Sequence, residues 1–139
     1  MATSSFSTHP FTSFVESCGA ILFDLRQPTT KKVCLTHYLA KDEWLLAKGR
    51  RNCGETRHEA ALREVREETG YPCHLHPVTM PTRCPPAIEV GHTPDEARVY
   101  NGICEPFMLT VREIDPQSGL KGDRKLIWWY IAALDDGLC

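Results

Sequence analysis

Glu64, Glu67 and Glu68 are the residues of this chain whose type and spacing most clearly indicate chemistry. They lie in the stretch 49–71, which reads GRRNCGETRHEAALREVREETGY. At about 100° per residue, an α-helix would place the three carboxylates on one arc. Like charges this close destabilise an isolated helix, so the grouping needs another reason. Carboxylate oxygens are ligands that Mg²⁺ prefers in proteins, and the pattern therefore predicts a divalent-metal site.

The residues on either side of the glutamates predict the limits of that helix, over 56–69. Thr56 and Glu59 fit a capping box, in which each side chain bonds the backbone amide of the other residue. Gly70 fits a left-handed stop, and Pro72 prevents continuation.

The faces of the helix predict what it contacts. A set of small and apolar residues shares one side, which we expect to face a core: Ala61, Leu62, Val65 and Thr69. The acidic arc lies beside that side. Helical geometry lets Arg63 pair with Glu67, but we expect Arg63 on a different face from Glu64.

This stretch resembles the Nudix box, GX5EX7REUXEEXGU, in which U is a bulky apolar residue. Gly49, Glu55 and the run 63–71 match every specified position. Seven fixed residues at about 7% each would arise by chance at on the order of 10⁻⁸ per starting position. The chain is therefore identified as resembling the Nudix hydrolases, which cleave pyrophosphate linkages.

The resemblance implies roles for individual residues. The expected catalytic set is Glu64, Glu67, Glu68, Arg63 and Glu55, with Glu64 near the attacking water and with Arg63 and Glu55 orienting the carboxylates. The expected metal ligands are Glu64, Glu67, Glu68 and the backbone carbonyl of Lys48. The implied cofactor is Mg²⁺, for which Mn²⁺ can substitute. Such an ion neutralises phosphate oxygens and lowers the pKa of bound water.

Two further segments indicate a substrate class. WLLAKGR (44–50) resembles the entrance of the diphosphoinositol polyphosphate and diadenosine polyphosphate hydrolases, apart from Ala47 and Arg50, and PFMLTVRE (106–113) resembles one of their strands. The expected substrate-binding residues are Lys48, Gly49, Arg50 and Arg51. A wider basic rim could add Lys121, Arg124 and Lys125. We therefore expect an anionic small-molecule pyrophosphate as the partner.

Other functions stay open at this point. Within the same chemistry, the substrate could be a nucleotide sugar or an oxidised nucleoside triphosphate. A different class is a phosphate-ligand sensor without catalysis, against which the intact box argues. An additional acidic ligand outside the box could be Glu89, Asp95, Glu96 or Glu105. Nucleic-acid binding is disfavoured, because the net charge is −2 and the basic residues are scattered.

The remaining sequence predicts one α/β domain over 15–139, preceded by a flexible arm over 1–14. We expect strands at 18–25, 33–39, 44–47, 105–114 and 126–134, and an extended segment at 72–79. A long functional loop is expected at 81–104, bordering the active site, and a basic hairpin loop at 116–125. The family resemblance implies an α/β/α sandwich with a mixed sheet and a loop–helix–loop box. Too few residues follow the last strand for that family's second helix, so we expect it to be missing or its face to be covered differently.

Composition adds an expected compartment and assembly. The seven cysteines form no CxxC pair, which is typical of reduced packing residues in an intracellular protein. Neither a signal peptide nor a run of 18 apolar residues is visible in the sequence, so we expect no membrane association. We therefore expect a cytoplasmic protein, with the nucleus as a second compartment. An uncovered apolar sheet face could support a homodimer instead of a monomer.

Overall fold

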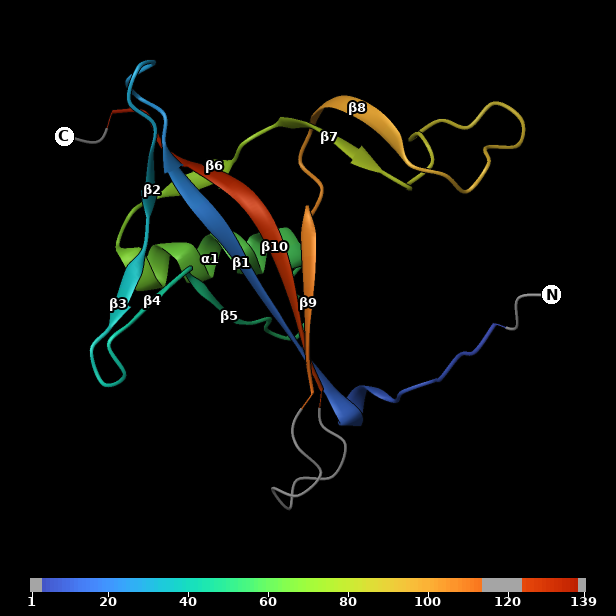
Figure 1. Cartoon of the computed structure of the whole chain (residues 1–139), viewed down its shortest axis with the longest axis horizontal. Helices are drawn as coiled ribbons and strands as arrows, with labels where there is room; N and C mark the ends of the chain where they lie inside the picture. Colours follow the sequence, from blue (N-terminus) through green and yellow to red (C-terminus); the bar gives the residue numbers. More distant parts are fainter. Residues whose placement is uncertain (1–3, 114–123, 138–139) are drawn as a thin grey trace.

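A long pair of parallel strands forms the centre of the molecule. The structure, a computed structural model, describes residues 4–113 and 124–137. β1 (Phe14–Asp24) follows a short 3₁₀ turn, η1 (Phe11–Ser13), and pairs in parallel with β10 (Arg124–Leu134) along almost its whole length. Four short strands extend this pair into a curled mixed sheet, all antiparallel to their neighbours: β2 (Lys32–Cys34) and β5 (Lys48–Arg50) on β1, and β6 (Cys73–Leu75) and β9 (Met108–Glu113) on β10 (Figure 1).

The helix α1 (Arg57–Thr69) covers one face of this sheet, as the sequence predicts. The Thr56 hydroxyl accepts from the Glu59 amide, and Gly70 ends the helix at φ 79°, so both predicted caps are confirmed. The core forms where α1 meets every second residue of β1. Its fully buried members are Cys18, Ala20, Leu22, Ala60, Ala61, Val65 and Ala132. Small residues dominate this set, which allows α1 to approach the sheet closely.

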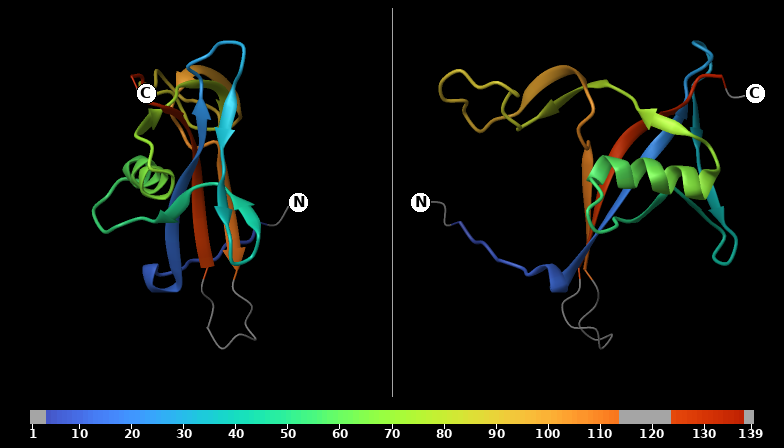
Figure 2. Two further views of the ribbon diagram at one scale, coloured as in Figure 1. Left: turned by 90° about the vertical axis from the view of Figure 1, so that its left-hand side faces the viewer. Right: turned by 180° about the vertical axis from the view of Figure 1, so that it is seen from behind.

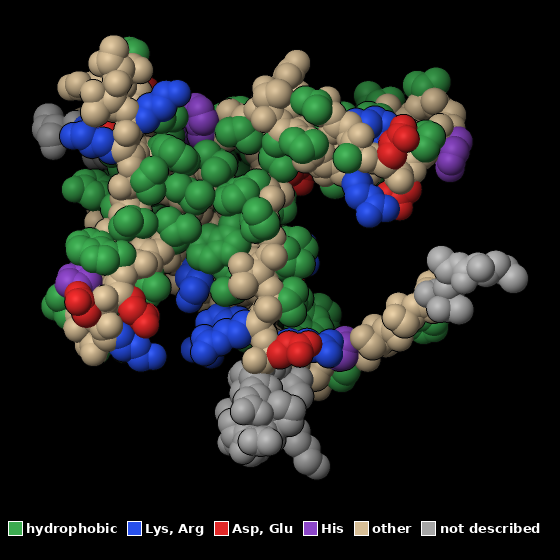
Figure 3. Space-filling view, viewed as in Figure 1, with side chains coloured by type: hydrophobic (Ala, Val, Ile, Leu, Met, Phe, Trp, Pro, Cys, Tyr) green, Lys and Arg blue, Asp and Glu red, His purple; other side chains and the backbone are tan. Residues whose placement is uncertain are grey.

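The opposite face of the sheet has no helix over it among the described residues. Figure 2 shows α1 on one side only, and Figure 3 shows many apolar side chains gathered on the other side. The α/β fold with a mixed sheet is confirmed, but the second helical layer of the expected sandwich is not present in residues 4–113 and 124–137. With 13 residues and several charges, α1 is also too short and too polar to span a membrane.

One predicted strand is divided in the structure, and another is shortened. The expected strand 33–39 breaks at Leu35 into β2 and β3 (Thr36–Tyr38). The expected strand 44–47 becomes β4 (Glu43–Leu45), which pairs with β3 as a separate hairpin, followed by β5. The break lets the chain leave the sheet edge as a hairpin and return to it as β5. The sequence of the box therefore begins on an edge strand of the main sheet.

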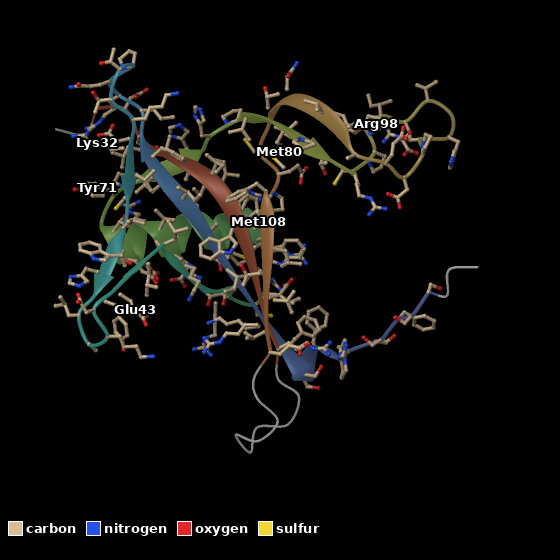
Figure 4. The ribbon with its side chains drawn as sticks, in the orientation of Figure 1. Lys32, Glu43, Tyr71, Met80, Arg98 and Met108 are labelled. Carbon is tan, nitrogen blue, oxygen red and sulfur yellow. The ribbon has the colours of Figure 1, made fainter. Side chains whose placement is uncertain are left out.

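The prediction of a long loop over 81–104 is wrong in both extent and place. β7 (Val78–Thr82) and β8 (Arg98–Ile103) pair as a hairpin, which leaves only 83–97 without strand structure. Figures 1 and 2 show this hairpin projecting away from α1 and β5, and the labelled Met80 and Arg98 in Figure 4 mark its two strands. The alternation in Arg98–Ile103 supports a strand, although the nearby prolines and glycine suggest a loop.

The expected basic hairpin loop, 116–125, lies mostly outside the described residues, and with it Lys121. The described part corrects its end, because Arg124 and Lys125 already belong to β10. The six cysteines within the described ranges are unpaired, as expected for reduced thiols: Cys18, Cys34, Cys53, Cys73, Cys84 and Cys104.

Candidate functional site

The edge strand β5 separates two groups of charged side chains. A Cβ added to Gly49 would lie 2.1 Å from the carboxyl carbon of Glu64, so Gly49 faces α1. A Cβ added to Gly19 on β1 would lie 2.6 Å from the Cβ of Lys48, which places Lys48 on the opposite face. Successive side chains of a strand alternate between faces, and Arg50 therefore shares the face of Lys48.

The contact between Gly49 and Glu64 explains why the box begins with a glycine. Any side chain at this position would occupy the space that the Glu64 carboxylate fills. We expect Gly49→Ala to displace Glu64 and to reduce catalytic activity by about tenfold or more, because a misplaced catalytic group costs that much. Steady-state kinetics and a thermal melt of the same sample check this. Wild-type kinetics in folded Gly49→Ala would show that the contact has no catalytic importance.

Arg63 links the carboxylates of α1 to the loop before the helix. Its Nε donates to Glu55 at 2.7 Å, and one terminal nitrogen donates to Glu64 at 2.8 Å and to Glu67 at 3.2 Å. The other terminal nitrogen donates to the backbone carbonyl of Arg50 at 2.9 Å. The pairing with Glu67 is confirmed. Arg63 also binds Glu64, although consecutive helical residues point in different directions, because its long guanidinium reaches around the helix.

Glu55 acts as the link between the box loop and the helix. Its carboxylate accepts from both Arg63 and the amide of Asn52. The Arg63 guanidinium, with help from the Asn52 amide, lowers the pKa of Glu55 to about 2. Glu55 is therefore a permanent anion that fixes Arg63.

Glu68 faces the same edge strand from further along α1. One of its carboxylate oxygens accepts from the backbone amide of Lys48 at 3.2 Å. Burial raises the pKa of Glu68, and the neighbouring Glu64 and Glu67 charges add to this effect, while the Lys48 amide opposes it. Glu64 and Glu68 thus both lie against β5, at Gly49 and at Lys48 respectively. Glu67 is more exposed than Glu64, with 58% of its side chain accessible against 14%.

The donor chemistry of this place fits a hard divalent cation. Mg²⁺ usually keeps several waters and takes one or two protein carboxylates. Glu64 and Glu68 can supply these from α1, where both lie against β5. In the described ranges no three acidic, histidine or cysteine side chains already converge as a metal cluster. Arg63 binds Glu64 and Glu67 through the same terminal nitrogen and compensates part of their charge.

The predicted substrate-binding residues do not stay together. Lys48 and Arg50 extend their side chains to the face away from the glutamates. Arg51 donates from Nε to Glu16 at 3.0 Å and from a terminal nitrogen to the Glu55 carbonyl at 2.9 Å. Arg51 is thus bound within the box loop, where it positions the backbone of Glu55. Of the rim residues, Arg124 pairs with Glu113.

Glu16 is the charged residue that sequence reasoning missed. It is 8% exposed on β1 and accepts from Arg51, Arg57 and the indole of Trp128. Burial by itself would raise the pKa of Glu16, but the hydrogen bonds from Arg57 and Trp128 outweigh it and hold the pKa below its usual range. The Arg57 guanidinium also stacks on Trp128, 4.7 Å from the ring centre.

This group of Glu16, Arg51, Arg57 and Trp128, which we call the Glu16 cluster, joins β1, the box loop, α1 and β10. A cleft of about 470 Å³ lies beside it. The sequence shows only that Glu16 lies just before an apolar strand. That signal does not identify the residues that Glu16 contacts. Of the acidic candidates outside the box, Asp95 pairs with Arg83, and Glu96 with Arg98, both in the projecting hairpin.

Comparisons with known proteins indicate the family of the chain. Residues 17–127 match the sequence profile described as the NUDIX domain. A stretch of 65 residues is 46% identical to an 8-oxo-(d)GTP phosphatase of Mycolicibacterium smegmatis, covering 41% of this chain and 20% of that protein. The fold is similar to the crystal structure of a C. elegans Ap4A hydrolase, with TM-score 0.51 and 16% identity over 89% of this chain and 70% of that one. The chain thus spans about a fifth of the length of its curated relative.

Proposed function

Because this chain belongs to the Nudix family, we propose that it is a divalent-metal-dependent pyrophosphohydrolase that acts on a small anionic substrate. The observation that carries the proposal is the placement of Glu64 and Glu68 against β5, with Arg63 fixing Glu64. Mg²⁺ is the proposed cofactor, held by these two carboxylates, the more exposed Glu67 and the carbonyl of Lys48. When bound, this ion supplies charge neutralisation for the phosphate oxygens and an acidified water.

The protein's own residues supply the remaining parts of the mechanism. Glu64 would accept the proton of the attacking water at the carboxylate oxygen that Arg63 does not bind. Glu55 keeps Arg63 in place, and Arg63 in turn keeps Glu64 from turning toward solvent. Such pre-positioning reduces the reorganisation needed during the reaction.

For the substrate, we place diphosphoinositol polyphosphates and dinucleoside polyphosphates first. Support comes from the WLLAKGR segment and from the basic side chains on β5. An oxidised nucleoside triphosphate is the second candidate, because the 65-residue stretch shares 46% identity with an 8-oxo-(d)GTP phosphatase. A nucleotide sugar, with only two phosphates, has less support from these charges.

A phosphate-release screen tests the proposal. Purified protein is incubated with Mg²⁺ or with EDTA and one of four substrate classes: diphosphoinositol polyphosphates, dinucleoside polyphosphates, 8-oxo-nucleoside triphosphates and nucleotide sugars. Products are identified by ion-exchange chromatography, with coupled phosphatase for products that are not free phosphate. We expect Mg²⁺-dependent turnover of at least one of the first two classes. Binding without turnover of any compound would instead identify a phosphate sensor.

A further inference from the structure

Four basic side chains share the face of the sheet opposite α1. The register of β5 on β1 pairs Gly19 with Lys48 and Ser17 with Arg50. Directly paired residues of antiparallel strands point to the same face, so both cations lie on the Gly19 face, away from the core. β10 pairs Val15 with Lys125, and β9 pairs Lys125 with Arg112. Side chains alternate along β1, so Val15 shares the face of Ser17 and Gly19. Lys125 and Arg112 therefore lie on the same face as Lys48 and Arg50.

The four side chains are close enough to repel one another. Burial lowers the pKa of Lys125, and the charges of Lys48, Arg112 and Arg50 lower it further. Among the described residues, none of the four forms an ion pair with an acidic side chain. Figure 3 shows Lys and Arg side chains gathered on this face, below its apolar region.

Such an arrangement costs stability, because like charges repel and no described carboxylate compensates them. Elsewhere this chain pairs its arginines closely, as in the contacts of Arg51 and Arg57 with Glu16 and of Arg83 with Asp95. Uncompensated cations of this kind are typical of sites whose counter-charge is a bound anion. We propose that Lys48, Arg50, Arg112 and Lys125 form an anion subsite that binds phosphate groups on the face of the sheet opposite α1.

The location of the subsite relates it to the proposed pyrophosphatase activity, on which this part of the inference rests. Only the edge strand β5 stands between Lys48 and Arg50 of the subsite and the carboxylates, since Lys48 and Gly49 are consecutive but face opposite sides. Lys125 and Arg112 extend the subsite across the same face of the sheet, on β10 and β9. A substrate that crosses this edge can present one phosphoanhydride to Glu64 and its remaining phosphates to the cations. The subsite therefore favours ligands with several phosphates beyond the reacting pair.

Direct binding tests the subsite without catalysis. The probes are inositol hexakisphosphate and inorganic tripolyphosphate, titrated in EDTA and followed by calorimetry. Arg112→Gln and Lys125→Gln remove one charge each from strands outside the box, and Lys31→Gln is the matched control on the exposed turn between β1 and β2. Each subsite variant should weaken binding of inositol hexakisphosphate by about tenfold, as expected for a lost charged hydrogen bond. Lys31→Gln should bind like the wild type.

Thermal melts check that the subsite variants are folded. Removing one of several repelling charges should leave the melting temperature unchanged or raise it, while affinity falls. Equal affinities of wild type, Arg112→Gln and Lys125→Gln in folded protein would overturn the subsite.

Kinetics separate this result from the failure of the proposed activity. With the substrate identified by the screen, the subsite variants should raise KM and leave kcat near the wild-type value. Binding that depends on Arg112 and Lys125 in a protein that hydrolyses nothing would retain the subsite and refute the hydrolase. Hydrolysis with unchanged KM in both variants would retain the hydrolase and refute the subsite.

Discussion

Glu64→Gln is expected to reduce metal-dependent pyrophosphate hydrolysis by at least about 100-fold while the protein stays folded, as is typical when an acid–base group is lost. The amide preserves the shape of the side chain, and its oxygen can still accept from Arg63. It removes the negative charge that would bind the cation and the carboxylate that would accept the proton. Initial rates at saturating Mg²⁺ measure the effect, and circular dichroism checks the fold.

Two further variants make this test specific. Glu113→Gln removes an exposed carboxylate on β9 and should keep the wild-type rate. Glu68→Gln should lower the affinity for Mg²⁺. Glu68 accepts from the Lys48 amide and does not bind Arg63, so its carboxylate charge is available to a cation. Near wild-type turnover by folded Glu64→Gln would remove Glu64 from the mechanism.

Glu16→Gln should reduce the free energy of unfolding by about 2 kcal/mol. Removing one partner of a buried ion pair costs roughly 3–5 kcal/mol, and the partial exposure of Arg51 and Arg57 reduces that figure. Urea denaturation at pH 7 measures the change. The same Glu113→Gln variant is the control, since an exposed pair contributes less than about 1 kcal/mol.

The pH dependence of the Glu16 effect follows from the direction of its pKa shift. The pKa in the folded state lies below the unfolded value of 4.5. Its stabilisation is therefore complete above that value and is lost as the pH falls through the folded-state pKa. We expect the stability difference between wild type and Glu16→Gln to be full at pH 7 and to shrink below about pH 4. A difference that is absent at pH 7 would mean that the Glu16 cluster adds no net stability.

The helix and its caps could be predicted from sequence because their signals are local. Thr56, Glu59 and Gly70 act within a few residues of one another, and the pattern of Ala61 and Val65 is enough to identify the buried side. The same holds for the α/β class, since long apolar strands such as β10 are recognisable without knowledge of their partners.

The directions of Lys48 and Arg50 could not be predicted, because they depend on the register of β5 on β1. A segment of three residues carries no periodicity that fixes its face, and a shift of one residue would reverse it. The Glu16 cluster was missed for a related reason. Its residues lie on β1, the box loop, α1 and β10, and only the fold brings them together.

The hairpin of β7 and β8 shows a different limit of sequence reasoning. The turn-forming residues between 83 and 97 favour one long loop that reaches into both neighbouring strands, although these strands alternate between half-buried and exposed residues. Both strands are short and contain a residue that is typical of turns, Pro81 in β7 and Gly102 in β8. Their composition therefore could not distinguish a hairpin from a loop, nor indicate that it projects away from α1.

Binding of Mn²⁺, followed by electron paramagnetic resonance, tests the central claim most directly, because it asks whether the carboxylates against β5 hold a cation. The samples are the wild type, the double variant Glu64→Gln/Glu68→Gln and the control Glu113→Gln. We predict that wild type and control bind Mn²⁺ with the same affinity and that Mg²⁺ displaces it, whereas the double variant binds at least about tenfold more weakly. Equal Mn²⁺ affinity in all three folded proteins would contradict the metal site on α1 and, with it, the proposed hydrolase.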